Sequence, residues 1–228
     1  MARRTRKEGV VVATSQQEGN KPVEILPGHT ISQRIRKEEG LGFSEVVSTM
    51  NGVHPKLVFP QTQVSYKIIS GQATFDFGEG RVVSVKQGGI ITIPAGKVYS
   101  FEGDFSCFMR CDPGFTPESS ILVDDNYEEQ TYSKLDRSYK EDIVEYNNEE
   151  PKRKMAVLGR TTYSVFKGKA TFFIDGEMFV LKEGDVITIP TDKEFAYNGN
   201  FAAFARIDSE DALDRVVYRS REEEQGLA

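Results

Sequence analysis

Two short segments decide the fold: Lys86–Pro94, which reads KQGGIITIP, and Lys182–Pro190, which reads KEGDVITIP. Upstream of them, Ser70–Phe75 (SGQATF) reappears as Lys167–Phe172 (KGKATF). The order and spacing of these blocks hold with a single one-residue gap between them. Self-similarity of this kind indicates that one structural unit is present twice in the chain.

The match continues downstream, where five positions of the first copy recur in the second. They are Gly103, Phe105, Phe108, Arg110 and Asp112, followed by Gly199, Phe201, Phe204, Arg206 and Asp208. The duplication therefore extends through the whole of each copy.

Each copy has the composition of short β-strands. Runs such as 65–69, 73–77, 82–85 and 90–93 are rich in β-branched and aromatic residues and are separated by glycines. Gly78–Gly80 and Asp175–Gly176 lie between two such runs, as hairpin turns do. Many short strands with few helical patterns predict an all-β protein built from sandwiches or barrels.

The expected organisation follows from the two copies. We expect a flexible basic arm over residues 1–24, a first barrel over 25–112, a polar connector over 113–139 with room for one short helix, and a second barrel over 140–208. A charged segment, 209–228, ends the chain. It could contain a C-terminal helix around residues 211–224, because Leu213, Val216 and Val217 lie at helical spacing.

Composition narrows the class of function. The 228 residues carry a net charge of −6, which gives no support for nucleic-acid binding. The basic cluster Arg3, Arg4, Arg6 and Lys7 could contact phosphates, but a solvated tail is the simpler interpretation. The apolar run Val10–Ala13 is shorter than a signal-peptide core, and no run approaches the roughly 20 residues of a membrane helix. We therefore expect a cytoplasmic protein without nucleic-acid or membrane partners.

The two cysteines are predicted to be free. Cys107 and Cys111 lie on one predicted strand, so their α-carbons are about 13 Å apart, too far for a disulfide. Both are interpreted as small core residues.

A glycine, a short apolar strand, a proline and a second strand resemble the second conserved motif of the cupin superfamily. Here the motif reads GGIITIPAGKVY at 88–99 and GDVITIPTDKEF at 184–195, and Tyr66–Gly71 and Tyr163–Gly168 are similar to the end of the first cupin motif. The resemblance covers roughly residues 40–112 and 140–208. It implies a bicupin, that is, two tandem cupin-like jelly-roll barrels.

The same resemblance implies that the metal ligands of cupins are missing. The histidine position of the second motif falls on Tyr99 and Phe195, and the glutamate position falls near Val64 and Thr161. The first-motif histidine positions fall within 58–60 and 155–157, and none of these side chains is a transition-metal ligand of the histidine or glutamate kind that the motifs require. The chain has two histidines, His29 and His54, so one chain cannot supply a site of three. We expect no metal and no other cofactor.

Some cupins, the sugar-nucleotide epimerases, resemble this fold and work without metal through a histidine base and a tyrosine acid. Tyr99 and His54 are the weak candidates for these two roles. The alternative is that Tyr99 is a core aromatic residue and that His54 lies in a surface turn, Asn51–Pro55, flanked by glycine and proline.

Six residues are predicted to contact a ligand: Tyr66, Tyr99, Arg110, Tyr163, Phe195 and Arg206. An arginine that faces a cavity could clamp a carboxylate or a phosphate. The alternative for Arg110 and Arg206 is an ion pair with Asp112 or Asp208 on the same strand face, opposite an apolar face that is the better candidate for the barrel interior.

The leading functional hypothesis is a metal-free bicupin that binds a small molecule, a sugar or an organic acid, or that has a structural or assembly role, rather than a metalloenzyme. Whether it is an enzyme stays open, with non-enzymatic binding favoured. The second hypothesis is a metal-independent sugar isomerase or epimerase that uses Tyr99. A third is a ligand sensor whose basic arm contacts a partner. A homodimer through a sheet edge or the terminal segments is also expected.

Overall fold

The computed structural model describes residues 6–7, 10–14, 21–36, 40–124, 127, 139–151, 155–157, 159–191, 193–208 and 216–218. These residues form antiparallel sheets, which confirms the all-β prediction. The chain divides into two compact units, residues 18–135 and residues 1–17 together with 136–228. Among the described residues, no helix has the length and apolar character that a membrane crossing needs.

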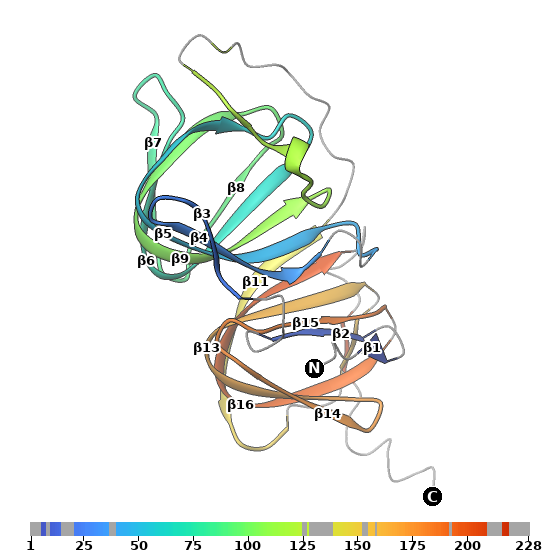
Figure 1. Cartoon of the computed structure of the whole chain (residues 1–228). Helices are drawn as coiled ribbons and strands as arrows, with labels where there is room; N and C mark the ends of the chain where they lie inside the picture. The colour runs from blue at the N-terminus through green and yellow to red at the C-terminus, as the bar shows by residue number, and fades with distance from the viewer. Residues whose placement is uncertain are drawn as a thin grey trace, which may run out of the picture. The chain divides into compact units, whose positions relative to one another are not determined.

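The first unit is one curved sheet (Figure 1) with the strand order β3-β4-β5-β9-β6-β7, in which β10 also pairs with β5 and β8 with β6. Its strands are β3 Val23–Leu26, β4 His29–Ile35, β5 Ser44–Val58, β6 Gln63–Asp76, β7 Val82–Lys86, β8 Ile90–Ile93, β9 Val98–Asp112 and β10 Ile121–Leu122. A short 3₁₀ turn, Pro117–Ser119, precedes β10.

The second unit repeats the central pairing of the first: β11-β16-β13 corresponds to β5-β9-β6, and β14 and β15 pair with β13 as β7 and β8 pair with β6. Its strand order is β1-β2-β15-β13-β16-β12-β17. Its strands are β1 Arg6–Lys7, β2 Val10–Ala13, β11 Tyr139–Asn148, β12 Met155–Val157, β13 Arg160–Ile174, β14 Glu177–Lys182, β15 Val186–Ile189, β16 Glu194–Asp208 and β17 Val216–Tyr218.

Each unit has its own core of aromatic and aliphatic side chains from the inward faces of its strands. The two cores match position by position: Tyr66, Phe75 and Phe101 in the first unit correspond to Tyr163, Phe172 and Tyr197 in the second. The predicted hairpins are confirmed, because β6 pairs with β7 up to Asp76↔Val82 and β13 pairs with β14 up to Ile174↔Glu177. Glu79 and Asp175 in their turns have a positive φ, as the turns favoured in hairpins do.

The N-terminal segment differs from the expected flexible arm. Residues 10–13 form β2, which pairs with β15 through Ile187↔Val12 and its neighbours, and all four are buried. The physical reason is that β15 is a short apolar strand whose second edge would otherwise carry unpaired backbone groups. Of the basic cluster, Arg3 and Arg4 lie outside the described residues.

The C-terminal segment also differs from the prediction. Val216–Tyr218 is a strand, β17, that pairs with β12, and not part of a helix. Three β-branched or aromatic residues in a row suit a strand better than a helix turn. The rest of the predicted helix, 211–215 and 219–224, lies outside the described residues.

Burial of β2 gives a stability prediction. Val12→Asp should lower the free energy of unfolding by more than about 3 kcal/mol, since it places a charge in the apolar core of the second unit. Val180→Asp, on the exposed face of β14, is the matched control and should change it by less than about 0.5 kcal/mol. Urea unfolding followed by circular dichroism measures the stability of both variants. Equal urea midpoints for Val12→Asp and Val180→Asp would show that β2 does not stabilise this barrel.

Candidate functional site

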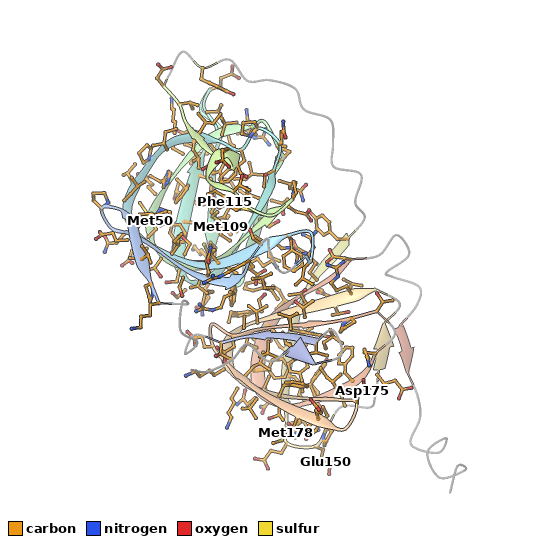
Figure 2. All side chains as sticks on the ribbon, turned by 45° about the vertical axis from the view of Figure 1, so that its right-hand side comes forward. Met50, Met109, Phe115, Glu150, Asp175 and Met178 are labelled. Carbon is orange, nitrogen blue, oxygen red and sulfur yellow. The ribbon has the colours of Figure 1, made fainter. Side chains whose placement is uncertain are left out.

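The first unit encloses a cavity of about 320 Å³. Its wall is mostly apolar, with polar side chains gathered on a few strands. It is lined by Ile25, Leu26, His29, Ile31, Gln33, Arg36, Ser44, Val46, His54, Leu57, Phe59, Tyr66, Phe101, Met109, Cys111, Phe115, Ser120 and Leu122. Figure 2 shows Met109 and Phe115, two residues of this wall, within the first barrel.

The segment after β9 covers part of the cavity. The Phe115 backbone N–H donates to Ser44 Oγ at 2.9 Å, and β10 pairs with the end of β5 through Leu122↔Leu57. Phe115 and Leu122 line the cavity while remaining partly exposed, so the cavity meets the solvent on this side.

His54 does not lie in a surface turn, which corrects the simpler of the two interpretations of this residue. It lies inside β5, opposite Phe101 of β9, and is 5 % exposed. Its neighbour Val53 points outward at 68 % exposed, as strand alternation requires. Glycine and proline were misleading here, because Gly52 continues the strand and Pro55 falls in a β-bulge between His54 and Leu57.

The second histidine, His29, lies beside the first, although no sequence motif singles it out. Their ring centroids are 5.2 Å apart, and His54 stacks on Phe101 at 4.5 Å. His29 Nε2 is 2.8 Å from Ser48 Oγ. The shared inward face of β4 and β5 brings the two rings together, and only the strand pairing His29↔Met50 reveals it.

Burial keeps both imidazoles uncharged near neutral pH. Burial, and secondarily the nearby His54, lowers the pKa of His29 to about 4. Burial also lowers the pKa of His54, although the hydrogen bond to Pro55 acts in the opposite direction.

Two of the predicted contact residues, Tyr66 and Tyr99, form a hydrogen-bonded pair with 2.7 Å between their hydroxyl oxygens. Tyr66 lines the cavity, and Tyr99 lies behind it and is 1 % exposed. Burial raises the pKa of both hydroxyls well above the ordinary tyrosine value, so both keep their protons.

In the second unit, Tyr163 and Phe195 pack into the core, with ring centroids 5.9 Å apart. Phe195 stands where the first barrel has Tyr99, so this position offers no hydroxyl to Tyr163.

Arg110 lies on the face of β9 opposite its cavity-lining residues, and Arg206 takes the matching position on β16 of the second unit. Arg206 Nε donates to Asp208 Oδ1 at 2.8 Å, the same-face ion pair that the sequence suggested, and its guanidinium lies 3.6 Å from the Tyr139 ring centroid. Arg110 lies 3.3 Å from the Phe43 ring centroid, a cation–π contact. Neither arginine is among the residues that line the cavity.

The donor set does not fit a cupin-type metal centre. The second-motif positions hold Tyr99 and Phe195, and Val64 and Thr161 take part in strand pairing. Within the described residues, no three histidine, cysteine or acidic side chains lie close enough to hold one metal ion. The side chains of 155–157 lie outside the described set. Cys107 and Cys111 are free, and burial raises their pKa to about 12, so both are thiols and not thiolates.

The buried histidine pair predicts a pH dependence of stability. Because the folded-state pKa of His29 lies below 6.5, the unfolded chain binds more protons between about pH 6.5 and 4, and the stabilisation present above this window is lost as the pH falls through it. The loss should be on the order of 2 kcal/mol. Unfolding of His29→Gln, compared with the unchanged protein at pH 7 and pH 4.5, should show a smaller pH effect; identical pH slopes would contradict the prediction.

No protein-family model and no curated protein matches the sequence. Solved structures do match. Protein YlbA from E. coli (family DUF861) aligns over 93 % of this chain and 96 % of its own, with a TM-score of 0.67 and 15 % identity. Oxalate decarboxylase from Bacillus subtilis aligns over 95 % of this chain and 79 % of its own (TM-score 0.66, 12 % identity), and salicylate 1,2-dioxygenase from Pseudaminobacter salicylatoxidans over 73 % and 71 % (0.56, 11 %). These are cupin-fold proteins, and this chain therefore has the cupin fold, present twice in tandem.

Proposed function

We propose that the protein binds a small, largely apolar organic acid in the cavity of the first barrel, and that it does so without a metal ion. The single observation that carries the proposal is the cavity itself, whose wall combines an apolar lining with one cationic side chain.

The apolar lining favours an organic acid over a sugar. Aliphatic and aromatic side chains such as Ile31, Phe59 and Met109 form most of the wall. A sugar needs many polar partners, and a wall of this kind would leave its hydroxyls without hydrogen bonds. The volume of about 320 Å³ lies near the lower end of the range of small-molecule sites, about 300–1,000 Å³.

The charge of the wall favours an anion. Among the described residues that line the cavity, Arg36 is the one with a permanent charge, and no aspartate or glutamate faces it. Both histidines are neutral near pH 7, since burial lowers their pKa. A carboxylate near Arg36 would gain a charge-assisted hydrogen bond, and no described residue of the lining would oppose it with a negative charge.

The donor set supports a binding protein rather than a metalloenzyme, because the cupin ligand positions hold residues such as Tyr99 and Phe195. Oxalate decarboxylase and salicylate 1,2-dioxygenase, which share the fold, are named for acids, which is in keeping with an acid as ligand.

Arg36→Met should weaken the binding of benzoate about 10- to 100-fold, because it removes the charge-assisted contact and keeps the length of the side chain. Binding of benzamide, which has the same ring without the charge, should change little. Isothermal titration calorimetry on the full chain measures both affinities.

Arg81→Met is the matched control, since Arg81 is exposed beside Phe77 and does not line the cavity. The protein should bind benzoate equally well after treatment with EDTA. Binding that disappears with the chelator, or that is equal in Arg36→Met and Arg81→Met, would contradict the proposal.

A metal-independent isomerase or epimerase is the second candidate, favoured by the position of His54 in the cavity wall together with Tyr66. His54 would be the base and the Tyr66–Tyr99 pair the acid. This candidate requires that the protein exchange deuterium from D₂O into the carbon next to the carbonyl of a keto-sugar nucleotide. Tyr99→Phe should abolish that exchange with a nearly unchanged melting temperature, and no exchange by the unaltered protein would exclude this candidate for the substrates tried.

A further inference from the structure

The hydrogen bond of His54 fixes where its proton lies. His54 Nδ1 is 2.8 Å from the carbonyl oxygen of Pro55. A carbonyl oxygen can only accept, so Nδ1 must carry the hydrogen and donate it. The β-bulge at Pro55 makes this contact possible, because it turns the carbonyl out of the regular ladder between β5 and β9.

A neutral imidazole carries one hydrogen on its two ring nitrogens. With that hydrogen on Nδ1, Nε2 carries a lone pair and can only accept a hydrogen bond. Burial, which lowers the pKa of His54, is consistent with this single-proton form at neutral pH.

Nε2 is the ring nitrogen of His54 that is left to accept a hydrogen bond from a ligand in the cavity that this residue lines. Among the described residues none is hydrogen-bonded to it, and it is not one of the fully buried polar atoms. The side chain is otherwise enclosed, at 5 % exposed, and it lines the cavity. His29 is the internal contrast, since its Nε2 is paired with Ser48 Oγ and its Nδ1 is fully buried.

The geometry points to Nε2 of His54 as a dedicated hydrogen-bond acceptor, which selects ligands that offer an O–H or N–H group to the wall of the cavity. Together with the proposed function, on which this step rests, it narrows the ligand class from an apolar acid to an apolar acid that also carries a hydroxyl or amino group. Nε2 of His54 and the guanidinium of Arg36 would then contact two different groups of one ligand.

The tautomer can be observed directly, because the chain contains only two histidines. In the full chain labelled with ¹⁵N-histidine, long-range ¹H–¹⁵N spectra at pH 7.5 should show a protonated Nδ1 and an unprotonated Nε2 for His54. The His29→Gln variant assigns the two rings. A His54 ring protonated on Nε2, the form preferred in water, would overturn the inference.

Two neutral probes test the acceptor without involving Arg36. 4-Methylphenol and 4-methylanisole share a ring and a methyl group, and only the phenol has an O–H. The phenol should bind about five-fold more tightly than its methyl ether, the worth of one ordinary hydrogen bond. Its binding should also shift the Nε2 resonance of His54.

Two variants of His54 separate the acceptor from the structural hydrogen bond. His54→Asn places an amide N–H near the position of Nδ1 and removes the acceptor, so the preference for the phenol should vanish. His54→Gln places a carbonyl near the position of Nε2 and should keep most of the preference.

The outcomes of the two proposals are distinguishable. A phenol that leaves the Nε2 resonance unmoved, or a preference that survives in His54→Asn, overturns the acceptor while leaving benzoate binding intact. Loss of benzoate binding with a retained phenol preference overturns the acid and leaves the acceptor standing.

Discussion

The pairing of one long strand with two neighbours holds each barrel together. β9 is hydrogen-bonded to β5 on one side and to β6 on the other over nearly its whole length, and β16 is paired with β11 and β13 in the same way. Gly71 and Gly168 lie at equivalent points of this pairing, where an added Cβ would collide with the backbone oxygen of Asp104 or Asn200. The close approach explains why both copies keep a glycine there while their interiors differ.

The interiors differ in their polar groups rather than in their packing. Replacing Tyr99 by Phe195 removes one hydroxyl, and the remaining ring still packs against Tyr163. The first barrel holds two histidines and a tyrosine pair in or beside its cavity wall, and the positions that match the tyrosine pair hold Tyr163 and Phe195 in the second. Duplication thus supplied two similar frameworks, of which the first carries the histidines and the tyrosine pair beside a cavity.

The repeat and its glycine turns were enough to predict the fold, because turn chemistry and strand alternation act over a few residues. The location of His54 could not be predicted in this way, since a glycine and a proline on either side favour a turn locally and only the long pairing with β9 overrides them. The spacing along the chain does contain a signal: His54 lies an even number of residues from Ser48 and Met50, so strand alternation puts all three on one face of β5. The pairing of β2 with β15 could not be predicted for another reason: Val10–Ala13 is a short apolar run, and its partner strand lies far away in the sequence.

That distant pairing bears on how the chain is made. Residues 10–13 leave the ribosome long before Val186–Thr188, the residues with which β2 pairs. The unit formed by 18–135 is continuous, so it can fold as soon as these residues are made, whereas the other unit must wait for residues 136 onward with its first strand already made. Until then an apolar segment of four residues has no sheet to join, and the protein depends on its own later half to cover it.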